Sequence, residues 1–286
     1  MENDKKAANN PLLNLGVGPD KERNYLTILS NFLIRYGAGL YKLDRLDKMV
    51  VVDDRDASIY DKWLTALNIE IAVKGTLQQK ELTEGPLVIV SNHPFGIVDG
   101  LILGGIAKKN GLNFKIMANY MLSSIADRIR QDIIGIDPYD DSVSIKRNVT
   151  PLKQAFNWLK NGNTMILFPS GDVANFNFSK MKIIEAPWLS SIARLIKGTK
   201  ANVLPIYFEG RNSILFYLLK NIHLKLGTFR LLNEFFNKAG TVIELHVGEV
   251  IRYNELEKVA AQQNLTDFLR EKTIGLGKSF HNPSQE

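Results

Sequence analysis

A ten-residue turn separates two apolar runs of the chain, and its sequence is Ser91-Asn92-His93-Pro94-Phe95-Gly96-Ile97-Val98-Asp99-Gly100. The run before it, residues 86–90, is short and rich in β-branched side chains, which predicts a buried strand. The run after it, residues 101–106, predicts the start of a helix. His93 and Asp99 therefore lie in a strand-to-helix turn at the carboxyl edge of a sheet, where open α/β sheets usually place their chemistry.

His93 and Asp99 suit proton transfer. A neutral imidazole is the best proton acceptor among side chains at pH 7. A carboxylate on its far nitrogen fixes the tautomer and stabilises the imidazolium that forms. Pro94 and Gly96 permit the turn that would bring the two side chains together. The alternative is that Asp99 only caps the following helix, and the pair alone favours that interpretation because capping aspartates are common.

Composition restricts the class of protein. The chain has 286 residues, of which 45% are hydrophobic, enough for one large domain or one large and one small domain. Cysteine is absent, which excludes disulfides and thiolate metal sites, and the four histidines are too scattered to predict a zinc site. We expect no metal, no signal peptide and no membrane span, and a cytoplasmic location.

The charge balance is basic. Lys and Arg exceed Asp and Glu by 36 to 30, a net charge of +6. Such an excess attracts polyanions, so anionic lipid and an acidic carrier protein are both permitted. No block of basic residues or nucleic-acid motif stands out, and we expect no nucleic-acid partner.

Hydrophobic periodicity divides the chain in two. Residues 1–69 predict a polar tail and a helical cap, with helices at 22–36 and 40–49 and a third that starts near Ser58. Residues 70–286 predict an α/β domain in which short apolar runs alternate with helical stretches. The fold class is α/β, with a mixed, mostly parallel sheet flanked by helices.

The individual elements follow from the same pattern. Strands are predicted at residues 69–73, 87–90, 114–117, 133–136, 165–168, 203–208 and 242–247. Helices are predicted after the His93 turn to about 109, and at 120–129, 142–160, 188–196 and 214–236. Asn254 and Glu257 predict a capping box for a last helix. The stretch 214–236 mixes large apolar and basic residues, so it predicts either a membrane-interface surface or a core helix with a charged outer face.

Two further polar stretches end predicted strands. Phe168-Pro169-Ser170-Gly171-Asp172 contains a glycine that allows close backbone approach, and its amides can form an anion-binding nest, although an ordinary turn has the same sequence pattern. In residues 204–213, Pro205 predicts an edge strand or a bulge. Arg211 can hold a phosphate or carboxylate, or simply pair with Glu209.

A basic pair, Lys146 and Arg147, lies on the predicted helix 142–160. Neighbouring residues on a helix point in different directions, so at most one of the two needs to face a site. A solvated helix face is the ordinary explanation for such a pair.

The turn also carries a family motif. Residues 93–100 form His-Pro-x-Gly-x-x-Asp-Gly, which resembles the first motif of PlsC-type glycerolipid (lysophospholipid) acyltransferases. In the larger family four residues separate the His from the Asp. Here five intervene, which is the spacing of the hemolysin-like branch that includes lyso-ornithine-lipid acyltransferases.

Other motifs follow in the order of that branch. Phe168-Pro169-Ser170-Gly171 is similar to the family's Phe-Pro-Glu-Gly, with Ser170 in place of the Glu and Val173 in place of the usual Arg. These departures make lysophosphatidic acid a less favoured acceptor. Residues 204–213 resemble the branch's strand followed by Glu-Gly-Arg-Asn-Ser, and Pro187-Trp188 and Arg147-Asn148 also fit. The combination favours the catalytic interpretation of the His–Asp pair over simple capping.

The resemblance implies an O-acyltransferase without cofactor, using acyl-CoA or acyl carrier protein as co-substrate. His93 would be the general base and Asp99 its orienting partner, and amides near Gly96 or Gly171 would stabilise the oxyanion. Substrate binding would involve Asn92, Gly96, Lys146, Arg147, Phe168, Pro169, Ser170, Gly171, Asp172, Glu209, Gly210, Arg211 and Asn212.

The implied partners are a lysolipid acceptor, the acyl donor and the membrane surface. The implied location is peripheral, on the inner face of the cytoplasmic membrane. Two alternatives remain at this point. One is a non-catalytic, hemolysin-like lipid- or membrane-binding protein, and the other is a thioester or lipid hydrolase that uses the same histidine with water.

Overall fold

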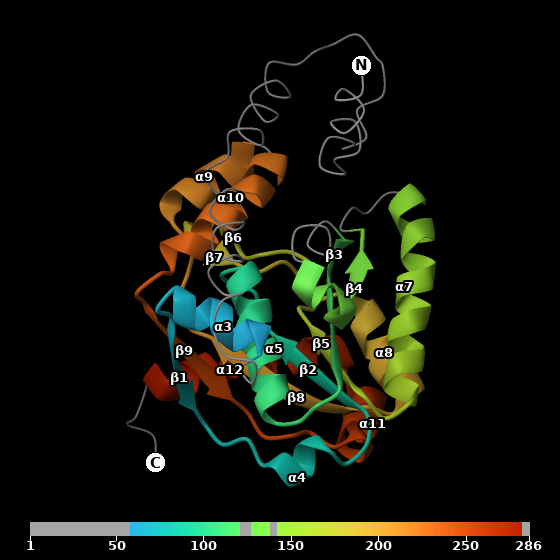
Figure 1. The fold of residues 1–286 in the computed structure, drawn as a ribbon. Helices are drawn as coiled ribbons and strands as arrows, with labels where there is room; N and C mark the ends of the chain where they lie inside the picture. Colours follow the sequence, from blue (N-terminus) through green and yellow to red (C-terminus); the bar gives the residue numbers. More distant parts are fainter. Residues whose placement is uncertain (1–57, 121–126, 138–141, 223, 282–286) are drawn as a thin grey trace, which may run out of the picture.

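The computed structural model describes residues 58–120, 127–137, 142–222 and 224–281. A seven-stranded sheet forms the centre of this part, with the strand order β1-β9-β8-β2-β5-β3-β4 (Figure 1). Its strands are β1 (Glu70–Lys74), β2 (Leu87–Ser91), β3 (Phe114–Asn119), β4 (Ile133–Ile136), β5 (Thr164–Leu167), β8 (Asn202–Phe208) and β9 (Val242–Val247). Every pair is parallel except β8 and β9. The predicted mixed, mostly parallel sheet is confirmed.

Helices cover both faces of the sheet (Figure 1). One face is covered by α3 (Ile59–Ala66), α5 (Ile97–Lys109) and α10 (Leu224–Asn237). The other is covered by α7 (Ser142–Lys160), α8 (Ser190–Thr199), α11 (Tyr253–Gln262) and α12 (Leu265–His281). The remaining helical elements are α4 (Gln79–Leu82), the 3-10 helix η1 (Asp127–Asp132) and α9 (Ile214–Ile222).

Strand β2 is buried on both faces, which explains its unbroken apolar sequence. Leu87 and Ile89 pack into the core under α5, whereas Val88 and Val90 pack into the core on the opposite face. A central parallel strand between two helical layers has no solvent face and so needs no polar alternation. Its position in the middle of the sheet places the His93 turn at the centre of the carboxyl edge.

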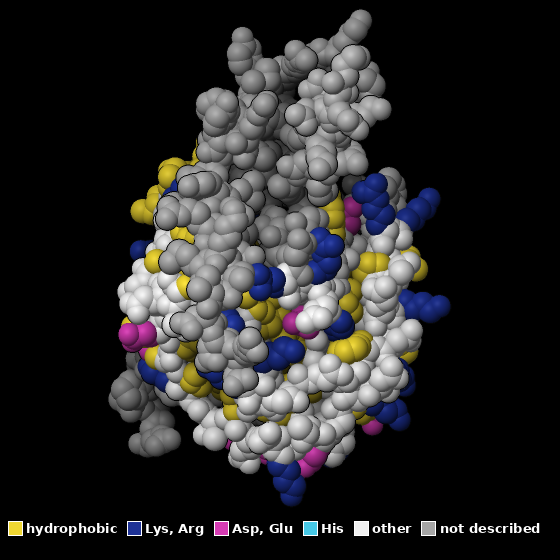
Figure 2. Space-filling model, in the orientation of Figure 1, with side chains coloured by type: hydrophobic (Ala, Val, Ile, Leu, Met, Phe, Trp, Pro, Cys, Tyr) yellow, Lys and Arg dark blue, Asp and Glu magenta, His cyan; other side chains and the backbone are white. Residues whose placement is uncertain are grey.

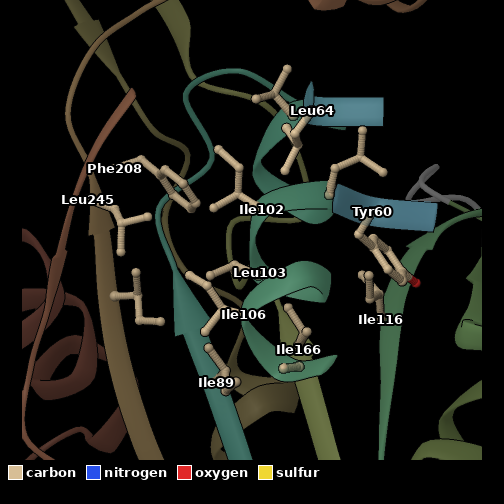
Figure 3. Packing of buried hydrophobic residues seen from close by; sticks show 14 of the residues in the cluster. Tyr60, Leu64, Ile89, Ile102, Leu103, Ile106, Ile116, Ile166, Phe208 and Leu245 are labelled. Atoms are coloured by element: carbon tan, nitrogen blue, oxygen red, sulfur yellow. The ribbon is translucent and has the colours of Figure 1, made fainter. Parts of the chain in front are cut away.

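Helix α5 is wedged between the sheet and α3. Figure 3 shows Ile102, Leu103 and Ile106 of α5 packed beside Ile89 of β2, with Tyr60 of α3 on the far side of the helix. Tyr60 is fully buried and donates a hydrogen bond of 2.9 Å to Asp132. The described part of the predicted cap therefore shares the main core, and the proposed division at residue 69 stays a prediction.

Three predicted elements need revision. The helix predicted at 120–129 falls partly outside the described residues, and its described end is the 3-10 helix η1. The single helix predicted at 214–236 is two helices, α9 and α10. They cross closely at Gly227, where an added Cβ would lie 2.8 Å from the Lys220 Cβ. The antiparallel hairpin of β6 (Asn175–Asn177) and β7 (Lys182–Ile184) was not predicted.

The predicted capping box at Asn254 and Glu257 is wrong. Helix α11 begins at Tyr253 with Arg252 as its N-cap, and α12 follows as a separate helix. The amide of Tyr253 donates to the Asn202 side chain, 3.0 Å away in β8. The cap is supplied by a residue distant in sequence, which a local motif cannot reveal. The helices predicted at 22–36 and 40–49 lie outside the described residues.

Pro205 lies in an interior strand, so the edge-strand alternative is wrong. Regular β8–β9 pairing includes Ile206 and Val247, and the next bridge joins Val203 to Ile251. Residues 204–205 of β8 thus face residues 248–250, one residue more, which is a bulge. The missing N–H of proline is tolerated there because the ladder is already interrupted, as the bulge alternative predicts.

Close packing of α3 on α5 gives a first prediction. A Cβ added at Gly104 would overlap the Tyr60 ring, so Gly104→Ala should lower the free energy of unfolding by about 1–3 kcal/mol through overpacking. Gly100→Ala in the same helix is the matched control, because nothing lies within 4 Å of its added Cβ. Denaturant unfolding of both variants measures the difference, and equal stabilities would contradict the packing described.

Candidate active site

The His93–Asp99 pair forms at the carboxyl end of β2. His93 Nδ1 lies 2.9 Å from Asp99 Oδ2, and the same oxygen accepts the amide hydrogens of Phe95 and Gly96, each at 2.9 Å. Gly96 makes this turn possible, since its φ of 90° lies in the region that favours glycine. Asp99 therefore does both things that the sequence left open, because it caps α5 and holds the histidine.

This arrangement fixes the histidine tautomer. A carboxylate oxygen can only accept, so Nδ1 carries the proton and Nε2 keeps its lone pair. Asp99 is fully buried, whereas the His93 side chain is 16% exposed. The imidazole is thus held at Nδ1 by a buried carboxylate while the side chain keeps some exposure, and the lone pair of Nε2 could accept a proton from a bound molecule.

Strand β5 places the second motif, residues 168–171, next to the first motif, residues 93–100. β5 pairs in parallel with β2, and Phe168 follows its last residue. The Phe168 ring stacks on the imidazole with a centroid distance of 3.9 Å and an interplanar angle of 21°. A backbone hydrogen bond of 2.9 Å from Ala174 to the His93 carbonyl joins the two turns again.

Oxyanion donors are predicted among the amides near Gly96 or Gly171, and the amides of these two glycines are themselves already engaged. The Gly96 N–H donates to Asp99, and the Gly171 N–H donates to the Phe168 carbonyl at 2.9 Å. Gly171 has a φ of 70°, so its role in this turn is conformational. Each of these two hydrogens is thus used to close its own turn, and an oxyanion donor among the other amides near Gly96 or Gly171 stays a prediction.

Asn92 joins the third motif, residues 204–213, to the His93 turn. Its side chain donates to the Phe208 carbonyl at 2.9 Å and accepts the Phe208 amide at 2.7 Å, which joins the ends of β2 and β8. Gly210, with a φ of 121°, lies against Phe95, and an added Cβ would be 2.6 Å from that ring. Asn212 donates to the Phe95 carbonyl at 3.4 Å. Asn92 and Asn212 are buried and bind protein groups.

Charged residues of the predicted site lie around this centre. Arg211 is exposed on the turn that follows β8, and its carbonyl accepts a hydrogen bond from Lys238 at 2.8 Å. Lys238 also lies 4.5 Å from the centre of the Phe95 ring, and burial lowers its pKa. Glu209, at the end of β8, is half-buried.

Lys146 and Arg147 lie on α7, beside the edge strand β4, which two other strands separate from β2. Both are exposed, and Arg147 forms an ion pair of 3.3 Å with Asp137 at the end of β4. The Asn148 side chain accepts a hydrogen bond from the Asp137 amide at 2.7 Å and donates one to the Asp137 carbonyl at 2.8 Å. The fit of Arg147-Asn148 to the family pattern thus coincides with a contact that anchors α7 to β4.

Sequence reasoning missed two residues beside residues 168–174, which we call the Ser170 turn. Lys220 of α9 is 5% exposed and pairs with Asp172 at 2.9 Å while it also donates to the Val173 carbonyl. Glu185, between β7 and α8, contacts Ser170 at 3.0 Å and Trp188 at 3.0 Å. Burial raises the pKa of Glu185. No spacing rule in the sequence joins Lys220 or Glu185 to the turn. Only the sequence Glu185-Ala-Pro-Trp188 indicates that Glu185 and Trp188 are close enough to interact.

Comparison with known proteins identifies the family of the chain. A family model described as acyltransferase matches residues 74–282. The chain belongs to the acyltransferase family. The resemblance drawn from the four motifs is thereby confirmed, and the matched region includes all of the turns described above.

Two curated relatives of this acyltransferase have a more specific description. A lyso-glycine lipid O-acyltransferase of Phocaeicola vulgatus is 27% identical over 213 residues, 72% of this chain and 72% of that protein. The protein of the same description from Bacteroides thetaiotaomicron is 24% identical over 215 residues, 72% of this chain and 74% of the relative.

A solved structure shares the fold. The 1-acyl-sn-glycerophosphate acyltransferase PlsC of Thermotoga maritima matches with a TM-score of 0.51 and 18% identity, and the match covers 92% of this chain and 98% of that one. Within the described residues of our acyltransferase, no helix is long and apolar enough to cross a membrane. The same residues contain no group of three or more metal-ligating side chains.

The two hydrogen bonds between the Asn92 side chain and the Phe208 backbone, which we call the Asn92 clamp, give a second prediction. Asn92→Ala leaves a buried N–H and a buried C=O of Phe208 without partners, which should cost about 2–4 kcal/mol of unfolding free energy. Asn113→Ala is the matched control, since its side-chain bond to Asn163 is exposed and should be worth less than about 1 kcal/mol. Equal losses in denaturant unfolding would argue against the clamp.

Proposed function

We propose that the protein transfers a fatty acyl group from an acyl thioester to the hydroxyl of a lysolipid at the membrane surface. The observation that carries this proposal is the contact of 2.9 Å between His93 Nδ1 and the buried Asp99 carboxylate in a chain of the acyltransferase family. The descriptions of both curated relatives support a lipid acceptor.

The proposed mechanism uses His93 as general base. Its Nε2 takes the proton of the acceptor hydroxyl as the oxygen attacks the thioester carbonyl carbon. The tetrahedral intermediate then expels the thiolate of CoA or acyl carrier protein, which takes the proton from the imidazolium. The Asp99 carboxylate stabilises the imidazolium at close range. The step forms an ester, breaks a thioester, and needs no cofactor or metal.

The acceptor is proposed to be a lyso-glycine lipid or a related lysolipid. Both curated relatives carry that acceptor in their descriptions. Ser170 and Val173 occupy the positions of the Glu and Arg usual in glycerolipid enzymes, which makes lysophosphatidic acid the weaker candidate. Arg211 is exposed on the turn after β8, which lies beside the His93 turn, so it is the first residue proposed to bind an anionic head group.

Action at a membrane surface is supported by α9. Its inner face buries Phe216 and Tyr217, but its outer face exposes Ile214, Leu215, Leu218 and Ile222, by 74, 48, 47 and 64%. In Figure 2 hydrophobic side chains gather at the upper left, over the helices α9 and α10 of Figure 1.

The β6–β7 hairpin extends this apolar surface. Phe178 and Met181 are exposed in its loop beside the exposed bases Lys180 and Lys182, and Asn221 of α9 donates to Asn175 of β6 at 3.1 Å. Apolar groups next to bases suit an anionic bilayer interface. The protein is proposed to bind there peripherally, on the cytoplasmic side of the membrane.

Turnover tests the catalytic proposal. The purified full chain is supplied with acyl-CoA and acyl carrier protein as separate donors and with lyso-glycine, lyso-ornithine and lysophosphatidic lipids in detergent. Mass spectrometry should detect a diacylated product whose rate falls on the order of a thousandfold in His93→Ala, because the general base is lost. Asp99→Asn should retain the fold, measured by circular dichroism, and lose a similar factor.

The alternatives give other products. Free fatty acid formed without any lysolipid would indicate a hydrolase. No use of either donor, together with intact vesicle binding, would indicate a non-catalytic lipid-binding protein. Retained acyl transfer in His93→Ala would contradict the mechanism.

Vesicle binding tests the docking surface. Leu218→Glu should weaken sedimentation with phosphatidylglycerol vesicles by about tenfold or more, since the buried area of one leucine is worth about 1.5–3 kcal/mol. Val242→Glu is the matched control, because Val242 is also apolar and 62% exposed but starts β9, which lies apart from α9 in Figure 1. Equal binding by the two variants would refute the assignment of this surface.

A further inference from the structure

The Ser170 hydroxyl has two oxygen neighbours but only one proton. Its Oγ lies 2.8 Å from the Asp172 carbonyl oxygen and 3.0 Å from Glu185 Oε1. The carbonyl can only accept, so a full hydrogen bond at this shorter distance takes the Ser170 proton. The second contact then needs a proton from Glu185. With an ionised Glu185, the one Ser170 proton would have to be shared between two acceptors, and neither contact would then be a full hydrogen bond.

The other oxygen of Glu185 is consistent with this assignment. The indole N–H of Trp188 donates to Oε2 at 3.0 Å. In a neutral carboxylic acid, Oε2 is the carbonyl oxygen that accepts from Trp188, and Oε1 carries the proton that goes to Ser170. Each donor then has one acceptor, in a continuous series from Glu185 through Ser170 to the Asp172 carbonyl.

The surroundings of Glu185 also favour the neutral form. Burial is the largest influence and raises the pKa of this carboxyl, whereas hydrogen bonds and the positive charges of His93 and Arg270 act against it. Burial raises the pKa of Tyr207 of β8, and the negative charges of Glu209 and Glu185 act in the same direction. Arg270 of α12 lies near, yet its Nε has no hydrogen-bond partner within the described part of the chain.

We propose that Glu185 is a neutral acid in the working enzyme and positions His93 by donating a hydrogen bond to the Ser170 turn. This inference rests on the proposed role of His93 as general base. Glu185 is a positioning residue, since it acts through the turn and touches neither the histidine nor, in the proposed mechanism, the substrate.

The connection from Glu185 to the imidazole is short. The Ser170 turn begins at Phe168, whose ring stacks on His93 at 3.9 Å. It ends at Ala174, whose amide donates to the His93 carbonyl at 2.9 Å. Lys220 holds the middle of the same turn through Asp172. Loss of the Glu185 bond would release the turn between these two contacts with His93.

Neutrality has a second consequence for the histidine. A charged Glu185 would add a negative charge near His93 besides that of Asp99, and would favour the protonated imidazole, which cannot act as a base. As pH rises and Glu185 ionises, the bond to Ser170 is lost and this charge appears. The enzyme should therefore lose activity on an alkaline limb caused by ionisation of Glu185.

Glutamine separates the neutral acid from the carboxylate. In Glu185→Gln the side-chain carbonyl can accept from Trp188 and the NH2 can donate to Ser170, and the side chain cannot ionise. We expect its kcat/KM to stay within about threefold of wild type near neutral pH and to lose the alkaline limb. Glu185→Ala loses both bonds and should fall by about tenfold or more.

The outcomes distinguish the alternatives. If Glu185→Gln is as impaired as Glu185→Ala at every pH, while both are folded by circular dichroism, the carboxylate charge is needed and the proposal is wrong. Wild-type kinetics in folded Glu185→Ala, with an unchanged pH profile, would likewise overturn it. Loss of only the alkaline limb in Glu185→Gln supports it.

Infrared spectroscopy supplies a readout that does not depend on activity. The difference spectrum of wild type minus Glu185→Gln at neutral pH should contain the C=O stretch of a protonated carboxyl group, which should vanish at high pH. A carboxylate band instead would refute the neutral acid whatever the protein catalyses. Because this measurement needs no substrate, its failure is separate from a failure of the acyltransferase proposal, and it remains decisive if Glu185→Ala does not fold.

Discussion

The buried carboxylate of Asp99 is the interaction on which the rest of the site depends. One oxygen receives three donors, the amides of Phe95 and Gly96 and the Nδ1–H of His93, all at 2.9 Å. A buried charge is costly unless it is hydrogen-bonded, and here the start of α5 supplies two of the donors. The same carboxylate oxygen that accepts the amides at the start of the helix therefore also holds the histidine.

The turns around this pair are held by side chains from distant parts of the sequence. Asn92 joins the ends of β2 and β8, and Lys220 and Glu185 hold the Ser170 turn from α9 and from the segment after β7. Several of these groups are buried, where a satisfied polar network makes a structure rigid and an unsatisfied one is costly. Rigidity of this kind suits general-base catalysis, because a proton transfer needs its donor and acceptor within hydrogen-bond reach.

The exposed apolar face of α9 is connected to the turns around His93 through Lys220. This residue is buried on the inner side of the helix and pairs with Asp172, four residues after Phe168. The surface proposed to meet the bilayer and the turn that stacks on His93 thus share one ion pair. Such an arrangement would hold the catalytic edge of the sheet at a fixed orientation to a surface from which a lipid acceptor would enter.

The sequence by itself determined the sheet strands, most helices and the turn that carries His93 and Asp99. Those features depend on local patterns, namely β-branched runs, helical periodicity and the spacing of glycine and proline. Only the tertiary structure decided that α11 is capped by Asn202, that Pro205 lies at a bulge in an interior strand, and that the Gly96 and Gly171 amides are occupied. It also brought Glu185 and Lys220 to the Ser170 turn, at separations of 15 and about 50 residues along the chain. The physical reason is that a hydrogen bond or an ion pair depends on distance in space, and the sequence pattern fixes distance only between near neighbours.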